Sequence, residues 1–304
     1  TDKTLNPRFV AIVLDSVSVR ASPSWLSDRL EKTGIRSLNT VIDITNYIMR
    51  DIGQPVHAFD YDEVLPDKSG TPTMRLRAAK KGETLVTLDG KKHILPGGDI
   101  VIEDGSGRLI DLCGIMGAEN SSVKATTTKI VLFMQTYDPS HIRATSMALA
   151  HRTEAAALFE KGVDSELSLP AMAEGIRLMQ EVTGACLASK LIDIYPDPYV
   201  PANVSVSKDK VFKYIACKLT DEKITRMLTP LGLVPNIQKD TIAVRVPSYR
   251  RDIERDVDII EEIARMHGYA KIQSILPPQS QKILTKDPVL NLENQLKIRF
   301  RDWG

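Results

Sequence analysis

The stretch GIRSLNTVIDITNYIMRDIGQPVHAFD, residues 34–60, decides how the surrounding chain is organised. The apolar, β-branched residues at 41–44 predict a short buried strand. The spacing of apolar residues over 45–51 then predicts a helix. Gly53 suits the left-handed position that ends a helix, and Pro55 prevents the helix from continuing. The stretch therefore predicts a strand, a helix and then a tightly framed connection.

His57 lies on that connection, just after the predicted end of the helix. Polar side chains on rigidly framed connections are candidates for chemistry. The alternative is a structural histidine whose ring bonds a backbone carbonyl, because isolated histidines are common and only some of them titrate usefully. Spacing alone leaves both interpretations of His57 open.

Composition limits the classes of protein to which the chain can belong. Its 304 residues are enough for about two domains. Lys and Arg number 40 and Asp and Glu 39, so the formal charge of +1 argues against a tight general nucleic-acid binder and allows only a local RNA-binding patch. The three cysteines are widely spaced, which indicates reduced thiols and a cytoplasmic location. Neither end resembles a natural chain terminus, so we expect a fragment of a longer protein.

Turn residues divide the chain into a strand-rich part and a smaller second part. Short β-like segments at 73–78, 83–88 and 99–103 follow one another, and Asp89-Gly90 predicts a hairpin. Prolines between 196 and 201 predict a linker. The predicted fold class is α+β: a mixed, largely antiparallel sheet domain with flanking helices, followed by a small αβ winged-helix-like domain.

The run DLCGIMGAEN, residues 111–120, holds Gly114 and Gly117 close together. Glycine lets the backbone approach a ligand because it has no Cβ. The alternative is a tight turn or a bulge. The run at 111–120 is not a phosphate-binding loop, because no Gly-Lys-Ser/Thr follows it.

Acidic residues gather near a predicted helix in the second part. Asp258, Glu261 and Glu262 share one helical face, and Asp252 lies in the approach to that helix. Such carboxylates suit a hard cation such as Mg²⁺. From spacing alone, they are more typical of acids near a positive helix N-terminus that pair with neighbouring arginines. The acidic face argues against the DNA-binding function that a winged-helix-like shape suggests.

These segments together resemble one family. Residues 35–60, HRTEAAALFEKGVD at 151–164 and PSYRRDIERDVDIIEEIARMHGYAKI at 247–272 closely resemble signatures of the β chain of bacterial phenylalanyl-tRNA synthetase. The resemblance implies an editing domain over 1–198 with a short remnant of a preceding domain, and a small helical domain over 199–275. It implies a linker and the first helix of a catalytic-like domain over 276–304.

The resemblance also implies roles for individual residues. The predicted catalytic pair is His57, which would position the ester or the attacking water, and Glu119, a buried acceptor for the hydroxyl of tyrosine. The predicted substrate-binding residues are Gly114, Gly117, Thr153 and Ala155. By the same resemblance, the positions assigned to Mg²⁺ are Asp252, Asp258, Glu261 and Glu262.

The implied activity is editing, by hydrolysis of mischarged tyrosyl-tRNA(Phe), within a ligase that joins phenylalanine to its tRNA. The implied partners are the α subunit and tRNA(Phe), in an α2β2 heterotetramer, and ATP would bind only in the parent complex. Ala156 and Leu158 replace the usual Ser and Arg of the family, and the lost guanidinium removes a bidentate donor. The alternative is therefore a non-catalytic assembly region with a degenerate pocket.

Overall fold

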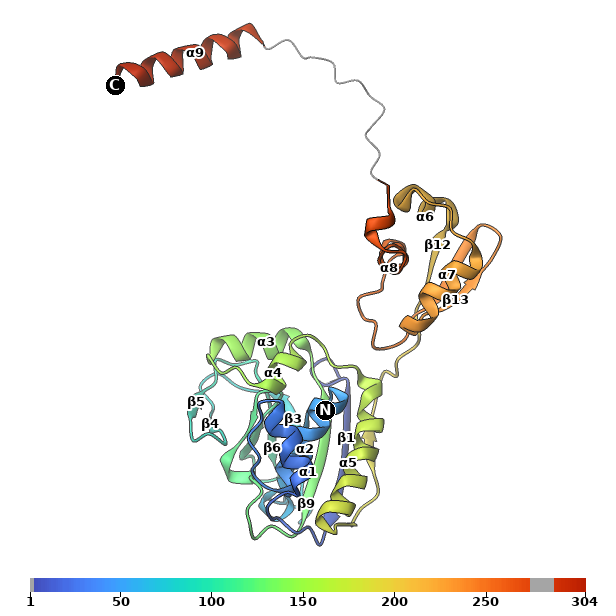
Figure 1. Ribbon diagram of the computed structural model, residues 1–304. Coiled ribbons are helices and arrows are strands. Elements are labelled where there is room, and N and C mark those ends of the chain that lie inside the picture. Colours follow the sequence, from blue (N-terminus) through green and yellow to red (C-terminus); the bar gives the residue numbers. More distant parts are fainter. Residues whose placement is uncertain (1–2, 274–286) are drawn as a thin grey trace.

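The computed structural model describes residues 3–273 and 287–304 (Figure 1). Within them, no helix combines the length and hydrophobicity that a bilayer-spanning segment needs. Antiparallel sheets flanked by helices make up the first unit, and a smaller αβ unit follows, so the predicted α+β fold class is confirmed. The boundaries predicted at 198 and 275 stay predictions. Residues 276–286 of the predicted linker, which include Pro277 and Pro278, lie outside the described residues.

The first unit is built on two antiparallel sheets and a hairpin. The larger sheet has the order β10-β1-β9-β2, and β11 also pairs with β1. The smaller sheet has the order β3-β6-β7-β8, and β4 pairs with β5. The strands are β1 (Arg8–Asp15), β2 (Val56–Asp60), β3 (Met74–Ala78), β4 (Thr84–Val86), β5 (Lys92–Ile94), β6 (Ile100–Asp104), β7 (Leu109–Leu112), β8 (Met116–Gly117), β9 (Ile130–Thr136), β10 (Cys186–Leu187) and β11 (Ile192–Ile194).

Helices cover these sheets and lead into the second unit. Those of the first unit are α1 (Ser24–Lys32), α2 (Thr40–Ile52), α3 (Pro139–Ala148), α4 (Glu154–Phe159) and α5 (Ser168–Thr183), with short 3₁₀ turns η1 (Tyr61–Glu63), η2 (Glu119–Ser121) and η3 (Ser165–Leu167). The second unit contains β12 (Asn203–Ser207), α6 (Lys208–Ile215), α7 (Asp221–Leu228), η4 (Thr229–Leu231), β13 (Val234–Ile237), β14 (Thr241–Arg245), α8 (Asp256–His267) and η5 (Tyr269–Lys271). Helix α9 (Pro288–Trp303) follows residue 286.

Strand β9 is buried on both faces and organises the first unit. Its residues alternate between two cores because successive strand side chains point to opposite faces. Val131 and Phe133 pack with the smaller sheet, whereas Leu132 and Met134 pack with α2 and α5. Strand β9 therefore has little freedom to shift and provides a rigid support for the side chains around it.

Residues 41–44 are not a strand, which corrects the sequence prediction. They form the first turn of α2, a single helix over Thr40–Ile52. Asn39 begins it, because its side-chain oxygen accepts hydrogen bonds from the backbone of Val41 and Ile42, both at 3.1 Å. Val41, Ile44 and Ile48 are then spaced for one buried helical face, which outweighs their β propensity. Gly53 ends the helix in the left-handed conformation, as predicted.

Pro23 is the N-cap of α1, and the hydroxyl of the preceding Ser22 donates to the buried carboxylate of Asp43 at 2.6 Å. Strand β13 of the second unit is absent from the sequence predictions. The predicted Asp89-Gly90 hairpin is confirmed, and it joins β4 to β5.

Replacing Asn39 with Ala should lower the free energy of unfolding by about 1 kcal/mol, because two backbone donors at the start of α2 lose their acceptor. Chemical denaturation measures the change. The matched control is Asn46→Ala in the middle of the same helix, where alanine is the better helix former by up to about 0.7 kcal/mol. Equal destabilisation by both substitutions would contradict the assigned cap.

Candidate active site

A pocket opens between β2, β9 and the segment that joins β7 to β8. It holds an empty volume of about 400 Å³, including the part open to solvent. Its wall is mostly apolar and aromatic, with a small number of polar groups, as is usual for small-molecule sites. The lining residues are Pro55, Val56, His57, Asp111, Gly114, Ile115, Met116, Gly117, Phe133, Gln135, Tyr137, Ala155 and Phe159.

His57 belongs to strand β2, not to an irregular connection as the sequence predicts. It pairs with Phe133 of β9 and packs edge-on against Phe59, with ring centroids 4.5 Å apart. The imidazole is half-buried because one side faces the pocket. Desolvation lowers its pKa to about 4. The ring is therefore neutral at pH 7, with one nitrogen that donates and one that accepts a hydrogen bond.

Gly117 lies directly against that imidazole. A Cβ at residue 117 would lie 2.5 Å from Cε1 and 2.7 Å from Nε2 of His57. Gly114 has a φ of 69°, and a Cβ there would lie 2.7 Å from Cδ1 of Ile142. The close spacing of these glycines reflects two separate steric needs: contact with the histidine and a left-handed turn in the pocket wall.

Asp111 is the carboxyl group inside the pocket. It belongs to β7 and is only 4% exposed. Burial raises its pKa to about 7, and a hydrogen bond from the Cys113 thiol acts in the opposite direction. Burial likewise raises the pKa of Cys113 and Tyr137, so both stay protonated. Near neutral pH, Asp111 can therefore either donate or accept a hydrogen bond.

Gln135 brings a polar group without a hydrogen-bond partner to the pocket wall. Its side chain is 1% exposed, and neither its amide oxygen nor its amide nitrogen has a hydrogen-bond partner among the described residues. Buried amides nearly always have partners, so an unpartnered one beside a cavity suggests that a ligand or water completes it. No sequence motif points to Asp111 or Gln135, because only the pairing of β7 and β9 into their separate sheets brings both residues to one pocket.

Glu119 does not lie where the sequence predicts. It is exposed, and it is not among the residues that line the pocket. The chain enters the 3₁₀ turn η2 immediately after Ala118, and this turn places residue 119 on the surface. The expectation of a buried glutamate in the pocket is therefore wrong, although its role in activity stays untested.

Thr153 and Ala155 both belong to the start of α4 but differ in position. Ala155 lines the pocket. Thr153 caps the helix: its hydroxyl accepts from the backbone of Ala156 at 3.1 Å and donates to the carbonyl of Ile115 at 2.9 Å. Thr153 thus fixes the pocket wall from behind.

The predicted Mg²⁺ ligands have other partners at the start of α8. Arg250 bridges Asp252, at 2.7 Å, and Glu262, at 2.6 Å. Oδ2 of Asp258 accepts from the backbone of Glu254 and Arg255, whereas Glu261 is exposed. Among the described residues, no three of these acids bring their ligand oxygens within 4.8 Å of one another. An ion shared by all four would therefore have to displace the Arg250 guanidinium.

Comparison with known families identifies the class to which this fold and pocket belong. Residues 5–184 match the family described as the B3/4 domain, and residues 204–269 match the tRNA synthetase B5 domain. Since the first match covers more than half of the 304 residues, the chain belongs to the B3/4 domain family.

Two curated relatives share one name. The chain is 37% identical over 277 residues to the phenylalanine–tRNA ligase beta subunit of Geobacter sulfurreducens. This match covers 91% of the chain and 34% of the relative. It is 38% identical over 273 residues to that of Gloeobacter violaceus, covering 90% of the chain and 34% of the relative. The predicted resemblance is confirmed, and the chain spans about a third of the length of these relatives.

Among solved structures, the chain is similar to an N-terminal fragment of the phenylalanyl-tRNA synthetase beta-subunit from Pyrococcus horikoshii. The two are 16% identical with a TM-score of 0.42, and the match covers 88% of this chain and 72% of the other.

Proposed function

We propose that this chain is a segment of a phenylalanine–tRNA ligase β subunit, and that its pocket hydrolyses tyrosyl-tRNA(Phe). The relatives' names and the order of the B3/4 and B5 matches support the first part. By the same proposal, the parent enzyme is cytoplasmic, joins phenylalanine to tRNA(Phe) with ATP, and assembles with an α subunit as α2β2. This chain would contact RNA by binding the tRNA that carries the ester.

The observation that most supports editing is the pairing of an apolar, aromatic wall with a buried carboxyl and an unpartnered amide. Phe133, Phe159 and Tyr137 supply the wall, and Asp111 and Gln135 supply the polar groups. Such a site suits an aromatic side chain that carries one hydroxyl. The side chains of the pocket, and not only the relatives' names, therefore support a hydroxylated aromatic substrate.

Editing needs a site that selects the hydroxyl of tyrosine. A pocket built for phenylalanine cannot strongly reject an analogue with one added hydroxyl, so discrimination falls to a second site. We assign the selecting role to Asp111, the carboxyl inside the pocket, in place of Glu119. The hydroxyl of tyrosine would add a hydrogen bond to Asp111, whereas phenylalanine would set an apolar ring edge against this carboxyl, at a cost of roughly 1–3 kcal/mol.

His57 would act on the ester as a neutral hydrogen-bonding group. With a pKa of about 4, it is uncharged when the reaction runs at pH 7. It would orient water, whose oxygen bonds to the ester carbonyl carbon while the bond to the ribose oxygen breaks. The proton of the water would pass to that ribose oxygen, which leaves free tyrosine and tRNA. No covalent intermediate with the protein is required.

Deacylation by variants in the assembled enzyme tests these assignments. His57→Ala should slow hydrolysis of tyrosyl-tRNA(Phe) by about 100-fold, the lower range of positioned acid–base groups. Asp111→Ala should reduce the preference for the tyrosyl over the phenylalanyl ester by about 10-fold or more. The matched control, Glu119→Ala, should change neither quantity. Loss of the preference in Glu119→Ala, but not in Asp111→Ala, would contradict the assignment of Asp111.

An assembly role is the second candidate function. Helix α9 exposes Leu292, Leu296 and Phe300, apolar residues typical of a surface that another chain covers. Ala156 and Leu158 support a degenerate pocket. An assembled enzyme that charges phenylalanine but never releases tyrosine would favour this alternative.

Magnesium binding by Asp252, Asp258, Glu261 and Glu262 stays a prediction. Their oxygen donors suit Mg²⁺ by chemical type. In the present arrangement the donors do not fit a shared ion, because Arg250 bonds two of them and the backbone bonds a third. No step of the proposed reaction depends on this ion.

A further inference from the structure

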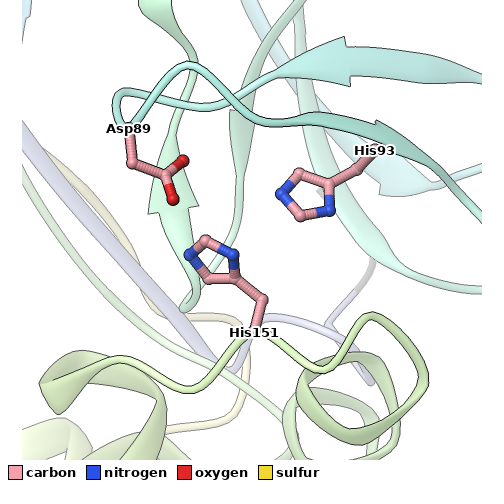
Figure 2. A group of neighbouring side chains, drawn as sticks. All are labelled: Asp89, His93 and His151. Carbon is pink, nitrogen blue, oxygen red and sulfur yellow. The ribbon is translucent and has the colours of Figure 1, made fainter.

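Two histidines and an aspartate that do not line the editing pocket lie together in the first unit (Figure 2). Asp89 comes from the turn between β4 and β5, His93 from β5, and His151 from the connection between α3 and α4. One ligand atom from each lies within 4.8 Å of the others. Figure 2 shows the carboxylate and both imidazoles facing a common space.

The two imidazoles are buried but incompletely bonded. His93 is 8% and His151 6% exposed, and their rings lie edge-on with centroids 5.0 Å apart. His93 bonds Thr87 through Nε2 at 3.2 Å, which leaves Nδ1 available. For the ring of His151, no hydrogen bond occurs anywhere in residues 3–273 or 287–304. Among the described residues, the side-chain atoms that lack both solvent and a partner do not include these ring nitrogens, so a ligand can reach them.

The surrounding backbone holds these side chains in place. The Thr87 hydroxyl contacts both His93 and Asp89, the latter at 2.6 Å, as an outer partner of metal ligands does. Ala150 takes a φ of 48°, a left-handed conformation that is costly for a residue with a Cβ and that directs the chain into His151. The backbone of His151 is bonded to Ser146 in both directions, each at 3.0 Å.

We propose that Asp89, His93 and His151 form a binding site for a divalent transition metal, with Zn²⁺ as the best match. Two imidazole nitrogens and one carboxylate oxygen are ligands that Zn²⁺ takes, whereas Mg²⁺ prefers oxygen alone. Zinc bonds of 2.0–2.2 Å place tetrahedral ligands about 3.4 Å apart, so closure needs shifts on the order of 1 Å. Asp89 lies on an exposed turn and can make that shift. The metal would replace the ammonium of Lys91, whose Nζ lies 2.9 Å from Oδ2 of Asp89. Water takes the fourth position.

The metal would fasten the β4–β5 hairpin to the start of α4, beside the editing pocket. The backbone of Leu88 donates to the carbonyl of Gly117 at 3.0 Å, and Thr153 donates to Ile115 from the other side. Both sides of the metal site therefore adjoin the wall that carries Gly117. This proposal concerns binding only and does not depend on the editing activity.

Calorimetric titration of the metal-free chain with Zn²⁺ tests the proposal, with excess Mg²⁺ present to saturate any magnesium site. We expect one Zn²⁺ per chain. Asp89→Asn, at an exposed position, and His151→Gln should each weaken binding by about 100-fold, and Thr87→Val by about 10–100-fold as an outer-partner change. His141→Gln is the matched control, because His141 is exposed on α3 and pairs with Asp138 instead.

Substitution with Co²⁺ gives a readout independent of affinity, since a tetrahedral site produces a strong visible absorption. That band should appear in the wild-type chain and in His141→Gln, and it should be lost in His151→Gln. Circular dichroism confirms that each variant is folded. Wild-type affinity in both Asp89→Asn and His151→Gln, or no saturable Zn²⁺ binding by the wild-type chain, would overturn the proposal. Binding that disappears only when the exposed Cys186 is replaced would overturn it too.

Discussion

Replacing Gly117 with Ala should reduce hydrolysis of tyrosyl-tRNA(Phe) by at least about 100-fold. The new Cβ would lie 2.5 Å from Cε1 of His57, closer than non-bonded carbon atoms approach. The residue takes no left-handed φ, so the substitution acts through contact and not through backbone strain. The imidazole must move by about 1 Å, a displacement that in an active site costs about 100-fold in rate.

Gly175→Ala is the matched control for this prediction. It adds the same methyl group on α5, against the ends of Ile48 and Leu132, on the opposite side of the larger sheet. Single-turnover deacylation should give the control a rate within about twofold of the wild type. A folded Gly117→Ala chain that retains the wild-type rate would show that His57 does not act from the observed position.

Replacing Asp111 with Asn should remove a pH dependence from the stability of the chain. An unfolded aspartate has a pKa near 3.9, and burial raises that of folded Asp111 to about 7. Between these values the folded state binds more protons than the unfolded state, so the free energy of unfolding falls as pH rises. The cost is absent below about pH 4 and reaches roughly 4 kcal/mol above pH 7.

Urea unfolding at pH values from 4 to 8 measures this dependence. Asp111→Asn should unfold with a flatter profile and should be more stable than the wild type at pH 8. Glu83 provides a comparison of opposite sign, because Arg77 lowers its pKa to about 2 and its contribution is lost as the pH falls. Parallel wild-type and Asp111→Asn profiles would contradict the burial of an ionisable Asp111.

The sequence predicts those features that depend on neighbouring residues. Gly53 ends a helix in a left-handed conformation, and Asp89-Gly90 forms its hairpin. The strand predicted at residues 41–44 is wrong. Their β-branched composition favours a strand, but the Asn39 cap and the buried face of α2 stabilise a helix. Local composition decides less than the packing of α2 against β9, and β9 lies far away in the sequence.

The candidate site divides in the same way. His57, Gly114, Gly117 and Ala155 are found from motifs and do line the pocket. Glu119 belongs to a motif but turns outward at η2, and the direction of a single side chain is beyond what spacing can give. Asp111 and Gln135 line one pocket only because their strands pair into the sheets. The rings of His93 and His151 come together only because the α3–α4 connection packs beside β5. Without contacts between distant residues, no local pattern identifies these pairs.

The relative rate of tyrosine and phenylalanine release tests the editing function most directly. The wild-type chain, assembled with an α subunit and the remaining β segments, would receive tyrosyl-tRNA(Phe) and phenylalanyl-tRNA(Phe) in separate single-turnover reactions. We expect tyrosine to be released about 10-fold faster or more, from one hydrogen bond to a buried carboxyl. Equal release of both amino acids, or release of neither by an enzyme that still charges phenylalanine, would contradict the proposed function.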